Sequence, residues 1–174
     1  MIMPNKNQLK NLSQKNWRLS HLWHIKDKNG QLIIFKPNRA QQHFFDNKHT
    51  RNIILKSRQL GFTTFETIDL LDDICWTPNF DALFIAQDLD TAKDIFDNKI
   101  WLAWSHYKLA PLYKLNTESA RQMKLDYGAS KAVSSITVDN SGRSGTYRRV
   151  HISEFGLICK KFPDKAREII EGTI

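Results

Sequence analysis

Residues 55–64 read LKSRQLGFTT, and no other stretch of this sequence constrains the fold as strongly. The usual phosphate-binding loop has the pattern G-x-x-x-x-G-K-[ST]. Gly61 and Thr63 stand where the second glycine and the hydroxyl residue belong, whereas Phe62 takes the lysine position and Lys56 the first-glycine position. The stretch is therefore either a phosphate loop built differently or a simple strand-to-helix turn that contains a glycine.

The segments on either side of the loop have the order that a phosphate loop requires. Residues 52–55 form an apolar run that predicts a short buried strand, and apolar residues at helical spacing predict a helix over 64–75. Backbone N–H groups at Gly61 and at the helix start can hold phosphate oxygens. Because Phe62 cannot supply a cation, Lys56 or Arg58 would have to supply it from the strand side.

The rest of the chain alternates strand and helix patterns, which predicts an α/β fold with parallel strands. A hairpin is expected within residues 17–36, around the turn signal DKNG, and a helix is expected to start at Pro37 and Asn38. The further expected elements are a strand at 82–86, a helix at 90–104, a hairpin at 124–138 with its turn at Gly128, a strand at 149–153 and a helix at 163–170.

Composition limits the class of protein. The 174 residues suffice for one domain with a core, and 41% apolar residues indicate a globular chain rather than a disordered one. No apolar run approaches the ~20 residues needed to span a bilayer, and the polar segment 1–16, expected to be flexible, has no secretory pattern. The formal charge of +8 favours a phosphate-rich partner, although many soluble proteins are basic for no specific reason. Cys75 and Cys159 are expected to be reduced thiols in a cytoplasmic protein.

Glu154 is the candidate catalytic carboxylate. It follows RRVHIS, where a strand would deliver its side chain to the carboxyl edge of the sheet, and open α/β sheets bind ligands there. A carboxylate near a γ-phosphate can orient and deprotonate water. Ser153 stands where a magnesium-binding Asp is usual, and a solvated glutamate at a strand end is the alternative.

Two further features are compatible with nucleotide or nucleic-acid contacts. Gln41, or its neighbour Gln42, lies on a helix before the loop and can hydrogen-bond an adenine edge, although an exposed helical glutamine is the simpler interpretation. The segment SGRSGTYRR at 141–149 contains three arginines that could contact DNA or nucleotide phosphate, with a mobile basic loop as the alternative.

The motifs PNRAQQHFF, KSRQLGFTT, IAQDLDTAKDIF and GRSGTYRRVHISEFG occur in this order, and together they are more specific than any one alone. The order resembles the ATPase domain of the large terminase subunit, the DNA-packaging motor of tailed bacteriophages, over about residues 31–174. The resemblance implies a P-loop NTPase of the additional-strand catalytic-glutamate type, with a mostly parallel sheet and flanking helices.

The resemblance also implies roles for individual residues. Lys56 matches a loop lysine displaced toward the start of the loop, Arg58 a proposed cis arginine finger, and Glu154 the catalytic carboxylate. Thr63 would hold Mg²⁺, and Gln41 would read adenine. The implied cofactors are ATP and Mg²⁺, and the cofactor-binding residues would be Gln41, Lys56, Gln59, Gly61, Thr63 and Thr64.

The implied partners are double-stranded DNA, the portal protein, the small terminase subunit and further copies in a ring, in the bacterial host cytoplasm at the procapsid portal. The family continues into a nuclease domain with clustered acidic residues, and no such cluster occurs before residue 174. We therefore expect residues 17–174 to be a partial ATPase domain without its nuclease domain, as in a fragment, a split gene or a degenerate prophage copy. The alternatives are a helicase-like P-loop motor and a non-catalytic DNA-binding remnant.

Overall fold

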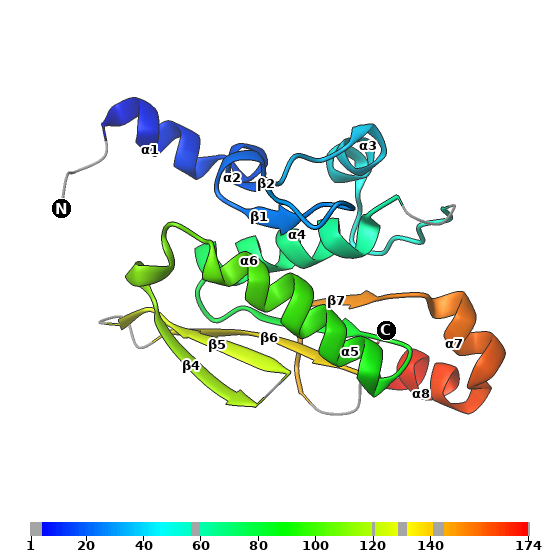
Figure 1. Ribbon diagram of the computed structural model, residues 1–174. Helices are drawn as coiled ribbons and strands as arrows, with labels where there is room; N and C mark the ends of the chain where they lie inside the picture. The colour runs from blue at the N-terminus through cyan, green and yellow to red at the C-terminus, as the bar shows by residue number, and fades with distance from the viewer. Residues whose placement is uncertain (1–4, 57–59, 120, 129–131, 141–144, 174) are drawn as a thin grey trace.

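The computed structural model describes residues 5–56, 60–119, 121–128, 132–140 and 145–173 (Figure 1). Helices and strands follow one another in runs along this length. The helices are α1 (Lys6–Ser13), α2 (Lys15–His21), α3 (Arg39–Asn47), α4 (Phe62–Trp76), α5 (Leu89–Ile95), the π-helix η1 (Phe96–Trp101), α6 (Leu102–Ser105), the short 3₁₀ turn η2 (Ala110–Leu112), α7 (Phe155–Lys161) and α8 (Pro163–Thr173). The strands are β1 (His24–Lys26), β2 (Leu32–Ile34), β3 (Asp81–Ile85), β4 (Lys114–Ser119), β5 (Gln122–Asp126), β6 (Val133–Asp139) and β7 (Arg149–Ile152). Of these strands, β3 has a helix directly before and after it.

Among the described residues, the main sheet has five strands in the order β4-β5-β6-β3-β7. Its centre is parallel, because β3 pairs in parallel with both β6 and β7, and Ile85 lies opposite Asp139 on one side and Ile152 on the other. The hairpin of β5 and β6 and the strand β4 add antiparallel pairs at one side. The sheet is thus mixed, with a parallel core.

Helices cover both faces of this sheet, and the side chains of β3 pack against the helices on each face. Ala82 and Phe84 belong to the larger core with α4 and α5, whereas Leu83 and Ile85 pack with Ile158 of α7 and with α8. Successive side chains of a strand point to opposite faces, so one strand contributes to two cores. Figure 1 shows α4, α5 and α6 together over one face of the sheet. The expected α/β arrangement, a sheet with flanking helices, is confirmed, although the sheet is mixed rather than mostly parallel.

The N-terminal elements form a further layer over α4. The predicted hairpin is present, with β1 and β2 antiparallel, but it is shorter than expected because residues 17–21 belong to α2. As expected, α3 begins after Asn38, with a capping box formed by Asn38 and Gln41. Residues 6–13 form α1, which buries no residue, so the flexibility expected for 1–16 stays a prediction. Cys75 is buried and Cys159 exposed, and both are free thiols.

The strand expected at 52–55 is absent, and this prediction is wrong. These residues belong to no sheet, and the exposed fractions of Ile53 and Leu55 are 92% and 94%. Only Ile54 packs against the core. An apolar run predicts an extended chain, but a strand also needs a neighbour that pairs with it. Within the described residues β7 is an edge strand, and this segment does not pair with it.

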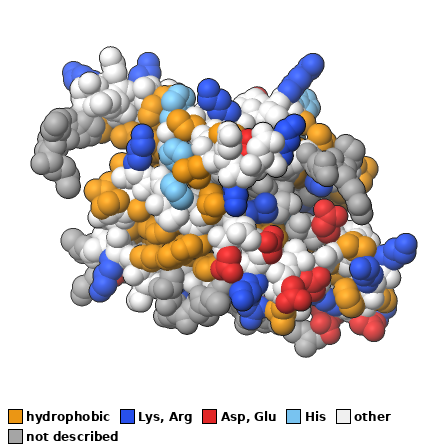
Figure 2. Space-filling view, in the orientation of Figure 1, with side chains coloured by type: hydrophobic (Ala, Val, Ile, Leu, Met, Phe, Trp, Pro, Cys, Tyr) orange, Lys and Arg blue, Asp and Glu red, His pale blue; other side chains and the backbone are white. Residues whose placement is uncertain are grey.

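The visible surface gives no single basic patch. Figure 2 shows Lys and Arg side chains interspersed with other side chains over this face, and acidic side chains gathered at the lower right, toward α7 and α8. None of the described helices combines the length and the apolar composition that crossing a membrane requires.

Candidate nucleotide-binding site

The glycine of the loop sits where the chain turns into α4. Gly61 is the residue before the first turn of this 15-residue helix, and its φ of 69° lies in the left-handed region that favours glycine. Among the described residues, no side chain caps the helix there. The first N–H groups of a helix have no partner within the helix, and the helix dipole adds partial positive charge. The start of α4 therefore has the chemistry of a phosphate site.

Phe62, at the usual lysine position, belongs to the core. Its residue is 5% exposed, and its ring packs edge-on against Phe44 at a centroid distance of 5.8 Å and against Phe65 at 6.3 Å. A lysine in this place would have to bury its charge among aromatic rings, which is costly. A cation for the phosphates must therefore come from elsewhere in the loop.

Lys56 and Glu154 lie together. The lysine Nζ is 3.7 Å from Oε1 of the glutamate, and the two side chains are 25% and 56% exposed. A loose surface pair of this kind contributes little to stability, typically ~0–1 kcal/mol. Either side chain can therefore leave this pair and contact a ligand instead, at a small cost in free energy. Arg58 and Gln59, the other loop residues expected at the site, lie outside the described residues.

Glu154 has an unusual backbone. Its φ is 55° and its ψ 39°, the left-handed conformation, at the junction between β7 and α7. A non-glycine residue in this region is strained by ~1–2 kcal/mol, and such strain clusters at functional sites. The preceding Ser153 is buried and continues the pairing with β3, because its N–H donates to the carbonyl of Ile85 at 2.8 Å. The sharp turn after this last pair presents Glu154 at the carboxyl edge of the sheet.

This edge is also where the chain direction switches. The chain leaves β3 toward α5 on one face of the sheet and leaves the adjacent parallel strand β7 toward α7 on the other. Ligands of open α/β sheets bind in the crevice outside the strands at such a point. Gln87 and Asp88 follow β3 at this edge, and Lys165 of α8 donates to the Gln87 carbonyl at 2.7 Å. The sequence pattern did not single out these three residues.

Gln41 contacts the loop itself. Its residue is 4% exposed, and its Nε2 donates to the carbonyls of Leu60 and Gly61, each at 3.0 Å. Gln42 instead donates to Asp46 on the same helix at 2.8 Å. Gln41 is thus the glutamine that the fold brings to the loop, and its role in adenine contact stays a prediction.

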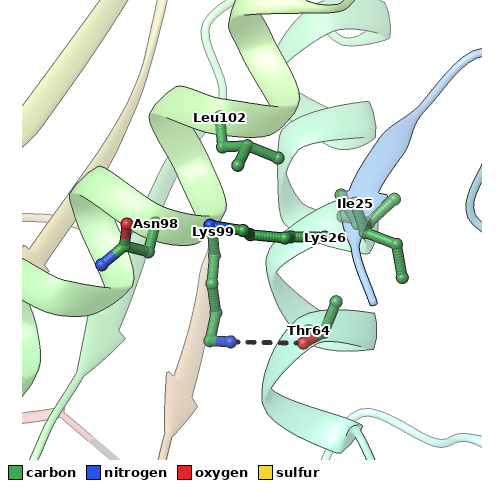
Figure 3. A pocket seen from close by; sticks show the side chains of 7 residues that line it. Ile25, Lys26, Thr64, Asn98, Lys99 and Leu102 are labelled. Atoms are coloured by element: carbon green, nitrogen blue, oxygen red, sulfur yellow. Dashed lines mark hydrogen bonds between the residues drawn. The ribbon is translucent and has the colours of Figure 1, made fainter. Parts of the chain in front are cut away.

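The threonines after the glycine occupy the first turn of α4. Thr64 Oγ1 lies 3.4 Å from Nζ of Lys99, which comes from η1 (Figure 3). The cavity beside this contact measures about 20 Å³, room for about one water molecule and not for a nucleotide. A larger open groove of about 280 Å³ lies between α3 and residues 53–55 and is lined by Ala40, His43, Phe44, Asn47, Ile53, Ile54, Leu55 and Phe62.

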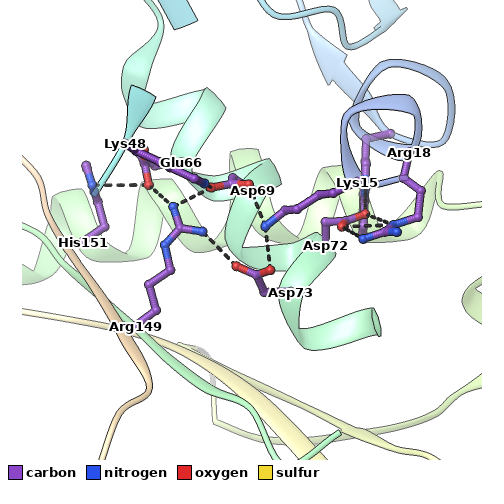
Figure 4. Close-up of polar contacts among 10 residues, drawn as sticks. Lys15, Arg18, Lys48, Glu66, Asp69, Asp72, Asp73, Arg149 and His151 are labelled. Atoms are coloured by element: carbon purple, nitrogen blue, oxygen red, sulfur yellow. Dashed lines mark hydrogen bonds and ion pairs between the residues drawn. The ribbon is translucent and has the colours of Figure 1, made fainter. Parts of the chain in front are cut away.

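A buried ionic cluster joins α4 to β7 (Figure 4). Arg149 of β7 bonds three carboxylates on one face of α4: Glu66 at 2.9 Å, Asp69 at 2.5 Å and Asp73 at 2.8 Å. Lys15, at the start of α2, also pairs with Asp69 at 2.7 Å. The suggestion that Arg149 contacts a phosphate is therefore wrong, because its guanidinium is held by these carboxylates.

Further contacts extend this cluster. Lys48, just after α3, pairs with Asp69 at 2.6 Å, and Arg18 of α2 pairs with Asp72 at 2.6 Å. Asp69 and Asp72 are fully buried. The acidic residues at i, i+3, i+6 and i+7 inside FETIDLLDD were the available sequence signal, but their basic partners lie far away in the sequence.

The cluster shifts the pKa values of its members. Burial raises the pKa of Glu66 to about 6, against the opposing charge of Arg149. Burial also acts to raise the pKa of Asp69, but Lys15, Arg149 and Lys48 together hold it well below its ordinary value. Burial and the positive charges of Arg149 and Lys56 lower the pKa of His151 to about 3, so this histidine is neutral at pH 7.

The donor set fits a nucleotide that brings its own metal ligands. No group of three or more His, Cys, Asp or Glu side chains suited to a metal occurs in the part of the chain that the structure describes. Mg²⁺ commonly binds through one or two protein oxygens, waters and substrate phosphates. The Thr63 hydroxyl in the first turn of α4 can be one such oxygen, whereas the buried Ser153 replaces the usual carboxylate.

Comparisons with known proteins agree with this architecture. No protein-family model matches the sequence, and no curated protein matches it either. Among solved structures, the Thermus phage P74-26 large terminase ATPase domain matches 99% of this chain and 68% of its own, with a TM-score of 0.60 and 14% identity. A mutant of that domain, with one arginine replaced by alanine, matches 98% of this chain and 68% of its own, with a TM-score of 0.61 and 13% identity. This chain therefore has a fold similar to that of phage large terminase ATPase domains.

Proposed function

We propose that this chain is the ATP-binding and hydrolysing portion of a phage or prophage large terminase subunit. The observation that carries the proposal is the meeting of Lys56 and Glu154 at the carboxyl edge of the sheet, with the segment of Gly61 leading into α4. A cation, a carboxylate and an uncapped helix start are the groups that phosphoryl transfer to water requires. The fold similarity to large terminase ATPase domains supports the same activity.

The proposed reaction needs little covalent chemistry from the protein. The phosphate chain would bind to the first N–H groups of α4, and the Lys56 ammonium would turn from Glu154 to the phosphate oxygens. The carboxylate of Glu154, released from this pair, would accept a proton from the water that attacks the γ-phosphorus in line. Mg²⁺, held in part by Thr63, would neutralise charge on the β- and γ-phosphate oxygens. Arg58 is proposed to stabilise the transferring group.

The base and the partners follow from the same proposal. The groove between α3 and residues 53–55, lined by Phe44 and Phe62 among others, would provide the space for a planar base. The energy of hydrolysis would move double-stranded DNA into a capsid. The motor would be a ring of copies of this protein at the portal, in the host cytoplasm, and it would act together with the small terminase subunit. The basic charge of the chain suits a DNA substrate.

The catalytic assignment is tested by Glu154→Gln. This variant keeps the shape of the side chain but removes the proton acceptor, so phosphate release in the presence of Mg-ATP and DNA should fall by ~10²–10⁴-fold, while ATP binding persists. Lys56→Ala should weaken binding itself. Glu171→Gln, an exposed glutamate of α8, is the matched control and should leave the rate unchanged. Wild-type activity in Glu154→Gln, or no phosphate release by the wild-type chain, would contradict the catalytic part of the proposal.

A further inference from the structure

The first turn of α3 is fastened to the glycine loop by three hydrogen bonds. The Gln41 amide donates both of its protons, one to the carbonyl of Leu60 and one to that of Gly61, each at 3.0 Å. Asn38 adds a third bond, from its Nδ2 to the Leu60 carbonyl at 3.1 Å. All three bonds end on backbone carbonyls at the end of the loop, immediately before α4.

The same two side chains also build the start of α3. The Asn38 side chain accepts from the backbone N–H of Gln41 at 3.0 Å, and the Gln41 side chain accepts from the backbone N–H of Asn38 at 2.9 Å. This capping box fixes both side chains relative to the helix. The loop carbonyls are therefore held by groups that have little freedom of their own.

We propose that Gln41 is a positioning residue that holds Leu60 and Gly61, the residues just before α4, in the conformation that binds phosphate, independently of the base that the nucleotide carries. The inference rests on the proposed nucleotide site and assigns the role of Gln41 within it. In this arrangement both amide protons are used, so the same amide has no donor left for an adenine ring. A base-reading role would require the loop bonds to break.

The geometry of Gly61 supports this role. A Cβ atom at this position would lie 3.0 Å from Nε2 of Gln41, tighter than nine in ten real contacts of such an atom, so the Gln41 amide would have to move by a few tenths of an ångström. Glycine thus suits this position twice, for the left-handed φ and for the undisturbed approach of the Gln41 amide. The bonds also orient the loop end before a ligand arrives, and a site ordered in advance loses less entropy on binding.

The proposal predicts a loss that does not depend on the base. Gln41→Glu keeps the acceptor that closes the capping box but replaces the amide donor with an oxygen facing two carbonyls. Binding of Mg-ATP, Mg-GTP and magnesium tripolyphosphate should weaken by the same factor, on the order of tenfold or ~1.4 kcal/mol, measured by titration calorimetry. Gln41→Met, with no donor or acceptor, is the second variant and should act in the same direction.

Gln42→Glu is the matched control, because it places the same charge one position further along α3, where the native amide bonds Asp46. It should leave all three affinities unchanged. A loss in Gln41→Glu confined to ATP, with tripolyphosphate binding intact, would overturn the proposal and favour adenine reading. An equal loss in Gln42→Glu would overturn it as well, because charge on the helix would then suffice.

A second measurement does not depend on nucleotide binding. Amide hydrogen exchange in the segment 60–65 of the ligand-free chain should be faster in Gln41→Glu and Gln41→Met than in the wild type and in Gln42→Glu. Unchanged exchange would overturn the positioning role. If the wild type bound none of the three ligands, the proposed function would fail, while the exchange result would still decide whether Gln41 holds the loop.

Discussion

Two residues of the candidate site adopt the left-handed backbone conformation, and only one of them is a glycine. Gly61 adopts it without strain and lets the loop turn into α4. Glu154 adopts it at an energetic cost, at a strand-to-helix turn that its own side chain does not cap. A strained carboxylate beside Lys56 is difficult to explain by stability alone, since the pair is loose and exposed. The proposed nucleotide site would explain the position of this carboxylate.

His151 makes the stability of the folded chain depend on pH. The folded pKa of about 3 lies below the ordinary 6.5, so between these values the unfolded chain binds more protons and stability falls as the pH falls. Glu66 acts in the opposite direction between its ordinary 4.5 and about 6, because its folded pKa is raised. The surrounding charges are Arg149, Lys56 and Glu66. The contribution of the histidine is best isolated by a substitution.

We expect His151→Gln to gain stability relative to the wild type as the pH is lowered. From pH 6.5 to pH 4.5 the difference in the free energy of unfolding should move by about 2–3 kcal/mol in favour of the variant, at ~1.4 kcal/mol per pH unit. Urea unfolding at both pH values measures this change. A difference that is independent of pH would show that the histidine titrates alike in both states.

Among the elements, α4 was predicted correctly and the segment before it was not. The apolar residues of 64–75 predicted a helix because their spacing is intrinsic to the chain, and α4 covers Phe62–Trp76. The apolar residues of 52–55 predicted a strand, but strand formation depends on a pairing neighbour that the segment itself does not specify. The structure brings Lys56 and Glu154 within 3.7 Å of each other although the strand expected before Lys56 is absent, and their roles at a nucleotide stay predictions. The bonds of Gln41 to the loop were not found, because they depend on how α3 packs.

Arg149 connects the strand that carries Glu154 to the helix that follows the loop. Arg149→Met would leave buried carboxylates of α4 without their shared partner, and breaking a buried pair commonly costs ~3–5 kcal/mol. We expect about 3 kcal/mol of unfolding free energy to be lost, because Lys15 and Lys48 still face Asp69. Thermal and urea unfolding measure the change.

The neighbouring arginine provides the control. Arg148 is exposed and lies immediately before β7, and its guanidinium lies 5.3 Å from the centre of the Phe80 ring. Arg148→Met should cost less than ~1 kcal/mol, the range of an exposed cation–π contact. Equal losses in the two variants would show that the ionic cluster does not join β7 to α4 as described.

For the whole molecule, three-dimensional similarity extends further than sequence similarity. Only 13–14% of positions are identical to the large terminase ATPase domain and its mutant, yet 98–99% of this chain aligns with them. The packing of two helical layers on a parallel core is insensitive to most individual residues, whereas phosphate chemistry depends on a few. The fold is therefore similar to that of those domains, whereas the proposed function depends on whether Lys56, Gly61 and Glu154 act as one site.

The most direct test of that site is the stability of the chain with and without nucleotide. At a Mg-ATP concentration a hundredfold above Kd, the free energy of unfolding of the wild type should rise by ~2.7 kcal/mol, seen as a higher denaturation midpoint. Lys56→Ala, which removes only a loose surface pair from the free protein, should unfold at nearly the wild-type midpoint without ligand and gain much less with it. No change in the wild type at saturating Mg-ATP would contradict the existence of a nucleotide site in this chain.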